Sequence, residues 1–397
     1  MKICDDAVIA FLLVVGLFFP TSVGGESRQS FIGIAFVLLA GSLLILTWRH
    51  GTRPGALLYV SLPILIVLTA CTLIACTFRF GWGTLASYCA LATIFVLNLK
   101  EVHAGRLVSI TFFLANVFWV VCGAAVVFGN GWVAEFLTSW YSLFYSELVP
   151  GMMSLHKPVL TFGTHSLAGF FTYLFFWLNW ERYTSRRIAS NLIFAICELI
   201  LLVALTSFTS FAFVILAITQ IGHWLWKHSR GVLLASAAGI VLTLLLTRSV
   251  LAEQIESLWQ NPEVASAVLN TENSGLLARY GAGGNLRGTV DYMWNHPFTP
   301  IGFTYPSFLF LGDSGPVQYL LRGSVPLLLL VYVGLYQFFR YNSPSRKYAL
   351  TLFFIFLFFE LGFDALPYFR TLFLLPFLVV YLKDVISTQS ADRACKS

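Results

Sequence analysis

Long apolar runs separated by short polar segments dominate the chain. A bilayer core needs roughly 20 mostly apolar residues for each crossing helix, with a range of about 17–25. We therefore predict about twelve transmembrane helices. They cover residues 7–22, 30–48, 56–76, 80–98, 107–128, 164–180, 189–205, 210–226, 231–249, 317–338, 349–364 and 368–382. The stretch 189–226 is divided in two because it is too long for one crossing and Thr206 to Thr209 interrupts it.

Composition supports the same class of fold. Apolar residues make up 58% of the chain and charged residues only 11%, whereas a soluble domain carries about 25% charged residues. We predict an all-α polytopic membrane helix bundle, with residues 1–397 forming a single transmembrane domain. The net charge of +6 comes from Lys and Arg residues scattered between apolar runs. That distribution orients membrane helices and does not indicate a nucleic-acid partner.

The positive charges predict the orientation of the bundle. If the amino terminus is inside the cell, the cytoplasmic segments hold twice as many of the 24 Lys and Arg residues as the outer segments do. Cytoplasmic loops carry this excess in membrane proteins. We therefore expect both the N-terminus and the C-terminus to be cytoplasmic.

Two long segments fall on the outer side, 129–163 and 250–316, the second between the ninth and tenth predicted helices. Loops of this length are usually functional or have structure of their own. Within the first, residues 131–148 have an amphipathic helical pattern, typical of a helix in the membrane interface or of the wall of a groove facing lipid. A second helix is expected over 252–272, as a solvated cap.

Carboxylates within the predicted spans are candidates for function, because burying a charge in a membrane is costly. Glu198 lies in the middle of one span and Glu360 well inside another, and Asp364 lies close in sequence to Arg370. Glu198 and Glu360 are either proton or ion sites of a transporter or structural groups. In the structural interpretation the two Glu residues have partners inside the bundle, and Asp364 pairs with Arg370.

Arginines are the most prominent charged residues of the outer segments. Guanidinium groups bind phosphate bidentately and stay charged, and the glycines around two of these arginines permit close approach of a phosphate. We regard Arg279, Arg287 and Arg322 as candidates for binding a phosphate group, with Arg370 across the bundle as a fourth. The alternative is that each arginine pairs with a lipid headgroup or a loop carboxylate.

Two further residues are candidates for the site. His165 opens the sixth predicted helix, and Asp313 lies in a Gly-Asp-Ser-Gly turn just before a helix. His165 is placed to contact a substrate, and Asp313 is suited to accept a proton from a hydroxyl. The structural alternatives are a hydrogen-bonded histidine and an aspartate that caps the helix. The cysteines and histidines have no metal-ligand spacing, so neither a metal nor another cofactor is expected.

In four stretches the chain resembles the bacterial O-antigen polymerase and O-antigen ligase superfamily. They are Lys157–Phe170, Leu205–Ser210, Arg287–Gly302 and Gly312–Gly323. Two departures stand out. Phe208 replaces an Arg that is common in the family, and Asp313 stands where ligases usually have His. The second departure favours polymerase over ligase.

The resemblance implies a metal-independent, inverting glycosyltransferase in the bacterial inner membrane. Its donor would be an oligosaccharide on undecaprenyl pyrophosphate, and it would polymerise these repeat units on the periplasmic side, where both long segments would lie. Arg279, Arg287 and Arg322 would then bind the pyrophosphate, Asp313 or His165 would take the acceptor proton, and Trp294 and Tyr305 would stack on sugar rings. A flippase and a chain-length regulator are the partners implied.

Two alternatives remain open. In the first, the chain is an O-antigen ligase that transfers the finished polysaccharide to lipid A-core. In the second, it is a transporter or flippase for lipid-linked sugars. A transporter would place its charges near the membrane midplane and keep its loops short, whereas this chain concentrates charge in one long outer segment.

Overall fold

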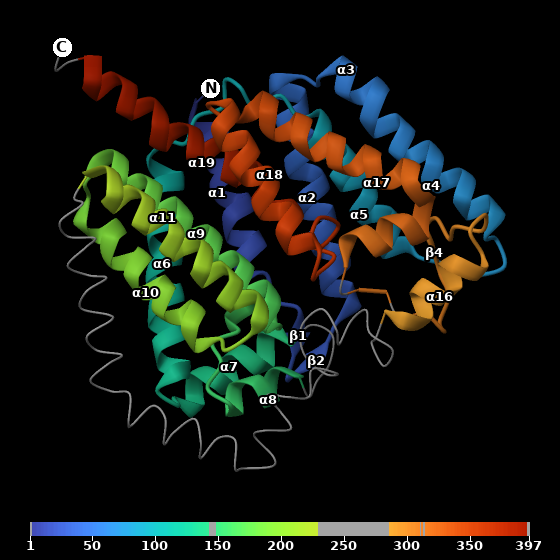
Figure 1. Cartoon of the computed structure of the whole chain (residues 1–397), viewed down its shortest axis with the longest axis horizontal. Helices are drawn as coiled ribbons and strands as arrows, with labels where there is room; N and C mark the ends of the chain where they lie inside the picture. Colours follow the sequence, from blue (N-terminus) through green and yellow to red (C-terminus); the bar gives the residue numbers. More distant parts are fainter. Residues whose placement is uncertain (1, 143–147, 229–285, 310, 313, 395–397) are drawn as a thin grey trace.

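The computed structural model describes residues 2–142, 148–228, 286–309, 311–312 and 314–394. Helices account for most of these residues (Figure 1). The helices are α1 (Lys2–Phe18), α2 (Gln29–His50), α3 (Pro54–Ala56), α4 (Leu62–Ile74), α5 (Trp82–Val96), α6 (Arg106–Val127), α7 (Gly131–Tyr141), α8 (Leu148–Ser154), α9 (His165–Arg186), α10 (Ala189–Ala204), α11 (Phe208–His228), α16 (Arg287–Asn295), α17 (Gly315–Asn342), α18 (Arg346–Glu360) and α19 (Phe369–Ala394). A π-helical turn, Leu57–Ser61, joins α3 to α4, and a 3-10 turn, Leu160–Phe162, precedes α9. The short strands are β1 (Ser22–Val23), β2 (Glu26–Ser27), β3 (Arg79–Phe80) and β4 (Thr304–Tyr305), which pair as β1 with β2 and β3 with β4.

Every predicted span except 231–249 coincides with a helix or, for 56–76, with the continuous helical segment 54–74. The span 231–249 and the expected helix 252–272 lie outside the described residues. The division of 189–226 is confirmed, because α10 ends at Ala204 and α11 begins at Phe208. Five described segments are long and apolar enough to cross a membrane. These long apolar helices indicate a multi-pass membrane protein.

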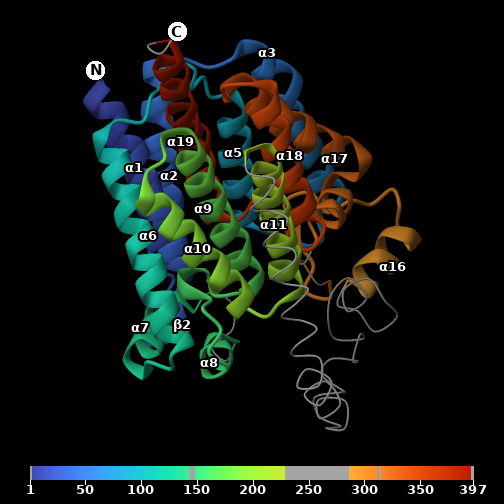
Figure 2. The same ribbon diagram turned by 60° about the vertical axis from the view of Figure 1, so that its left-hand side comes forward.

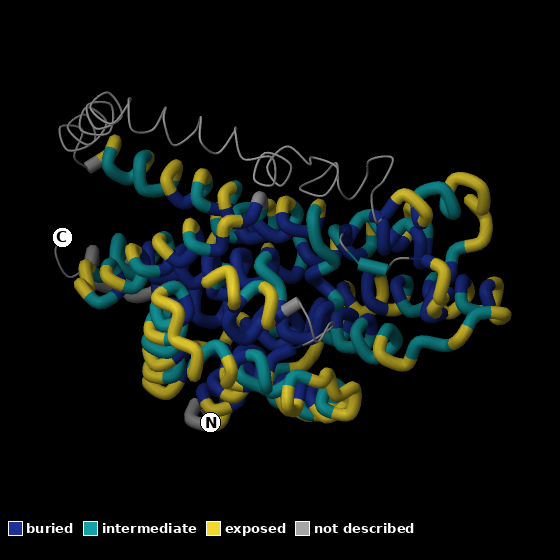
Figure 3. Tube along the Cα trace, turned by 90° about the horizontal axis from the view of Figure 1, so that it is seen from below, coloured by how far each residue is buried: buried dark blue, intermediate teal, exposed yellow. Residues whose placement is uncertain are grey.

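The outer faces of the helices carry exposed apolar side chains, as a surface in contact with lipid would. Val37 on α2 is 71% exposed, Leu73 on α4 is 72% exposed and Ile215 on α11 is 65% exposed. Patches of this kind on a soluble protein would promote association. In Figure 3 the buried residues occupy the interior and the exposed residues lie mainly on the outer helices.

Helix α9 lies at the centre of one half of the bundle and is buried from Ser166 to Trp180. It packs against α10, α11 and α19. Aromatic stacking fixes its first turns, because the Phe170 ring lies 4.1 Å from the Phe359 ring of α18 and the Phe162 ring lies 4.2 Å from the Phe171 ring. This contact places the start of α9 and the end of α18 at the same end of the bundle.

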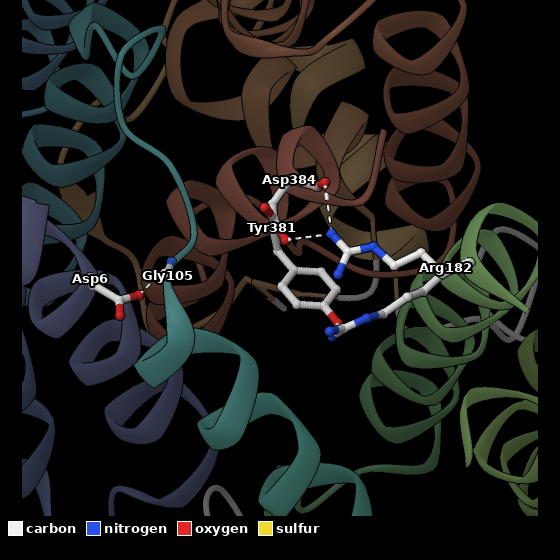
Figure 4. Close-up of polar contacts among 6 residues, drawn as sticks. Asp6, Gly105, Arg182, Tyr381 and Asp384 are labelled. Carbon is white, nitrogen blue, oxygen red and sulfur yellow. Dashed lines mark hydrogen bonds and ion pairs between the residues drawn. The ribbon is translucent and has the colours of Figure 1, made fainter. Parts of the chain in front are cut away.

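The two ends of the chain lie together at the other end of the bundle (Figures 1 and 2). There the carboxylate of Asp6 on α1 accepts hydrogen bonds from the first backbone N–H groups of α6, with distances of 2.7 Å from Gly105, 2.8 Å from Leu107 and 3.1 Å from Val108. These are N–H groups that a helix leaves without partners within itself. Figure 4 shows Asp6 beside Gly105.

The amphipathic segment 131–148 forms a shorter helix than predicted, because α7 ends at Tyr141. The β1–β2 hairpin stops it: the backbone N–H of Ser142 donates to Ser22 Oγ at 2.9 Å, and Ser22 Oγ donates to the carbonyl of Ser139 at 3.0 Å. Tertiary hydrogen bonds therefore replace the ones that would continue the helix.

Arg370 has a different role from the predicted pairing with Asp364. Its guanidinium is fully buried and donates to the carbonyls of Gly16, Leu17 and Phe19 at 3.0 Å each. These carbonyls are at the end of α1, where no following helical turn can donate hydrogen bonds to them. Arg370 thus links α19 to the end of α1. These hydrogen bonds explain why the guanidinium is buried, without the phosphate ligand that the sequence suggested.

We predict that Asp6→Ala lowers the free energy of unfolding by about 1–2 kcal/mol, because it removes a charged cap that satisfies three buried N–H groups. Thermal unfolding of the purified protein in detergent measures the change. Glu26→Ala is the matched control, since Glu26 forms only an exposed ion pair with Arg28 at 2.9 Å, and such pairs contribute about 0–1 kcal/mol. Equal melting temperatures for the two variants would contradict the capping role.

Candidate functional site

Helix α17 is broken close to its start, and the candidate site is built around this break. Gly323 and Ser324 depart from helical geometry, with φ of +57° at Ser324, and Pro326 follows. Proline has no N–H to donate and clashes with a preceding turn, so it favours such a break. The short first part of α17 therefore ends at Arg322, with its last carbonyls available to other partners.

A segment that precedes α17, residues 301–305, donates hydrogen bonds to these carbonyls. The backbone N–H of Ile301 donates to the carbonyl of Leu321 at 3.0 Å, and that of Gly302 donates to the carbonyl of Arg322 at 2.9 Å. In return, the Arg322 guanidinium donates to the carbonyls of Gly302 at 2.8 Å and Thr304 at 3.3 Å. Loop and helix end therefore satisfy each other's polar groups.

The same segment is held on its other side by the turn between α4 and α5. Thr72 Oγ1 accepts from the N–H of Phe303 at 2.8 Å, and the carbonyl of Phe303 accepts from the N–H of Gly81 at 2.9 Å. Gly302 has a φ of +57°, and a Cβ added to it would lie 2.4 Å from the backbone nitrogen of Thr72. Only glycine fits this position without displacing the chain.

Behind this segment, a buried carboxylate joins α18 to α17. Glu360 accepts from the hydroxyl of Tyr319 and from the backbone N–H groups of Ala365 and Leu366, each at 2.7 Å. The first residue of α17, Gly315, packs directly on it, so that a Cβ there would lie 1.6 Å from Glu360 Oε2. Glu360 therefore has partners inside the bundle, as the structural interpretation predicts, and Glu198 also has one, because it accepts from Asn179.

Asp364 is the second carboxylate of the cluster. It lies in the loop after α18, because the helix ends at Glu360 and not at residue 364, where the predicted span ends. Burial raises the pKa of Asp364 to about 7, and the nearby positive charge of Arg322 opposes this rise. Its Oδ1 atom is buried and accepts no hydrogen bond from the described residues.

Two further buried donors come from the neighbouring helices, Tyr88 from α5 and Gln318 from α17. The hydroxyl of Tyr88 is within electrostatic range of Asp364, Arg322 and Glu360. Gln318 lies on α17 next to Tyr319. Tyr88 Oη and Gln318 Nε2 are buried atoms without hydrogen-bond partners among the described residues. Buried polar atoms are normally satisfied by protein or by water, so this cluster has donors available to a polar ligand.

The predicted site residues occupy different parts of this region. Arg322 is buried in the cluster, and Tyr305 lies in β4, half-exposed, directly after the carbonyl that Arg322 contacts. Arg287 and Trp294 lie on α16, where Arg287 is exposed and paired with Asp291 at 3.0 Å and Trp294 is 85% exposed. Arg279 and Asp313 lie outside the described residues.

His165 is the first residue of α9, directly after Thr164, whose side chain caps the helix by accepting from the N–H of Leu167 at 3.3 Å. It lies at the same end of the bundle as Glu360, because Phe170 and Phe359 stack. Asp364 was missed as a chemical candidate because it was read as a partner of Arg370. The signal was its place four residues after Glu360, at the end of an apolar run.

Comparison of the chain with protein-family models, with curated proteins and with solved structures found no match. The function is therefore argued from this cluster and from the resemblance described above.

We predict that Gly302→Ala loosens the segment 301–305, because its Cβ meets the backbone of Thr72. The variant should be cleaved faster than the wild type by a protease added to the outer side, at sites within this segment. Gly288→Ala is the matched control, since a Cβ at Gly288, on the exposed face of α16, meets nothing within 4 Å. Identical cleavage rates for both variants would show that the segment is not held as described.

Proposed function

We propose that the protein is a membrane-embedded glycosyltransferase that polymerises oligosaccharide repeat units carried on undecaprenyl pyrophosphate. The observation that carries the proposal is that the buried carboxylate of Asp364 lies within electrostatic range of the buried guanidinium of Arg322 at the break in α17. The resemblance to O-antigen polymerases supports it, because three of the stretches that carry the resemblance, 157–170, 287–302 and 312–323, lie at this end of the bundle or belong to this region.

The chemistry requires a base and a positive charge, and the cluster has both. In the proposed reaction, an acceptor hydroxyl oxygen bonds to the anomeric carbon of the donor sugar, and the bond from that carbon to the pyrophosphate breaks. The hydroxyl proton passes to the Asp364 carboxylate, and the electron pair leaves with the pyrophosphate. A general base works best when its pKa is near the working pH, as that of Asp364 is.

The leaving pyrophosphate gains charge as the bond breaks, and arginines are suited to stabilise it. Arg322 is held in place by its bonds to Gly302 and Thr304, which reduces the reorganisation needed during the reaction. Arg287, exposed on α16, and Arg279 are proposed to bind the pyrophosphate from the outer loop, and Trp294 and Tyr305 to contact sugar rings. Asp313 and His165 remain proposed alternatives to Asp364 as the base.

We also propose the full topology of about twelve crossings in the bacterial inner membrane, with both termini cytoplasmic. Both ends of the described chain lie at one end of the bundle (Figures 1 and 2), which fits an even number of crossings. The cluster around Arg322 then lies at the periplasmic end.

The proposed partners are the lipid-linked oligosaccharide, a flippase and a chain-length regulator. An O-antigen ligase is the alternative enzyme, and a flippase the alternative from another class.

We predict that Asp364→Asn lowers the polymerisation rate about a hundredfold or more, the range expected for loss of a general base. In the wild type the base is active when deprotonated, so the rate should rise with pH through about 7 and fall below it. The variant should lose this dependence. Polymerisation of purified lipid-linked repeat units by protein in detergent, measured from pH 5.5 to 8.5 (roughly the range around a pKa of 7), tests both statements.

Glu26→Gln is the control for that experiment, since Glu26 lies in the exposed β1–β2 hairpin and pairs only with Arg28. Its rate and pH profile should match those of the wild type. An Asp364→Asn variant with the wild-type rate would remove Asp364 from the mechanism and leave Asp313 or His165 as the base.

Deletion of the gene should collapse the ladder of surface polysaccharide to core plus a single repeat unit, as loss of a polymerase requires. Complete loss of attached sugar, with polymer still on the lipid carrier, would identify a ligase instead.

Complementation with Arg287→Ala separates enzyme from transporter. An impaired enzyme leaves single repeat units on the periplasmic face of the membrane, whereas an impaired flippase leaves them on the cytoplasmic face.

A further inference from the structure

A second buried polar cluster lies between α6, α9 and α10, apart from the cluster around Arg322. Its centre is Asn179 on α9, whose side-chain nitrogen donates to Asn116 Oδ1 at 2.7 Å and to both carboxylate oxygens of Glu198, at 3.0 and 3.1 Å. Asn191 completes the chain of amides by donating to Asn179 Oδ1 at 2.9 Å. All four side chains are buried, Glu198 and Asn179 completely.

The charge of Glu198 is not balanced by these partners. Its hydrogen bonds come from one neutral amide, and no Lys, Arg or His of the described chain forms an ion pair with it. An isolated carboxylate in a low-dielectric interior is strongly disfavoured unless it is paired or neutralised. The amide chain therefore stabilises the position of the carboxyl group without compensating a full negative charge.

A cavity next to the outer members of this amide chain has room for water. The cavity of about 100 Å³ lies beside the cluster and is lined by Asn116, Asn191, Arg182, Ser109 and Ser190, among others. This volume is several times the share of a water molecule in the liquid, about 30 Å³. Ser109 and Ser190 lie near the start of α6 and of α10, so the cavity reaches toward the end of the bundle that holds the chain termini.

The polar atoms around Glu198 are not arranged to bind a metal cation. A metal cation needs several oxygen atoms directed at one point. Here the oxygens of Asn116 and Asn179 already accept hydrogen bonds, and a nitrogen faces both oxygens of Glu198. The charged group that lines the cavity also has a partner. Arg182 on α9 donates to the hydroxyl of Tyr381 on α19, as Figure 4 shows. Cys197 is the neighbour of Glu198 on α10.

We propose that Glu198 is a proton-binding site inside the membrane, reached by water from the cavity at the terminal end of the bundle. The carboxyl group is protonated at neutral pH and exchanges its proton through the cavity, on the opposite side of the bundle from the cluster around Arg322. The site is independent of the proposed glycosyl transfer, which uses a different carboxylate.

Infrared difference spectroscopy of the purified protein at pH 7 tests the proposal. The carbonyl stretch of a protonated carboxylic acid should be present in the wild type and reduced in Glu198→Gln, a variant that keeps the size and a hydrogen-bonding oxygen. Glu135→Gln is the control, because Glu135 lines an open pocket at the outer surface and should leave this band unchanged. Identical bands in the wild type and Glu198→Gln would overturn the proposal.

A second measurement needs no variant. Dicyclohexylcarbodiimide, an apolar reagent that enters membranes, adds to protonated carboxyl groups and forms a stable acylurea. At neutral pH the peptide that contains Glu198 should carry this adduct, with less at higher pH. Ser190→Trp, which fills the cavity, should slow the loss of label when the pH is raised briefly before the reagent is added. A labelled fraction that does not change with pH would contradict proton exchange at this site.

Discussion

The exchange of backbone hydrogen bonds at the break in α17 is the constraint on which the outer end of the molecule depends. A helix that stops inside a membrane leaves carbonyls that water cannot reach, and each needs another partner. The segment 301–305 supplies the partners for Leu321 and Arg322, and Arg322 in turn supplies partners for Gly302 and Thr304. Neither the helix end nor the loop segment is satisfied without the other.

This exchange has a consequence for the chemistry. Because the guanidinium of Arg322 is fixed by two carbonyls, its positive charge stays beside Asp364 and Tyr88 in the interior. Glu360 fixes the other side, through Tyr319 and the loop after α18. The result is a rigid polar cluster at one end of the bundle, with buried donors that have no described partners. Preorganised charge of this kind is what a reaction with an anionic leaving group requires.

The helices were predictable from the sequence, because the spacing of apolar runs is imposed directly by the thickness of the bilayer. Even the short interruption between α10 and α11 was visible as a polar turn. The tertiary partners were not predictable in the same way. Arg370 was expected beside Asp364, yet its guanidinium binds the end of α1, more than 350 residues earlier in the chain. Likewise α7 stops at Tyr141 because a distant hairpin competes for its last carbonyls, and no pattern within 131–148 encodes that competition.

The candidate site was anticipated in part. Arg322 and Tyr305 were singled out, and they lie beside the break, whereas Asp364 was assigned to a structural pair. Its environment depends on burial by α17 and on the charge of Arg322, which are properties of the fold. Glu198 and Glu360 looked alike in the sequence as single carboxylates in apolar runs. In the structure Glu360 joins the outer cluster, while Glu198 belongs to a separate chain of amides next to a cavity.

Hydrogen exchange at the backbone amides of Ile301 and Gly302, in the full-length protein in lipid nanodiscs, tests the central claim most directly. Both amides donate to carbonyls of α17 in the arrangement described, so they should exchange as slowly as amides within the neighbouring helices. Exchange of both at the rate of an unstructured peptide would mean that the loop does not close the end of the broken helix, and the cluster around Arg322 would lose its support.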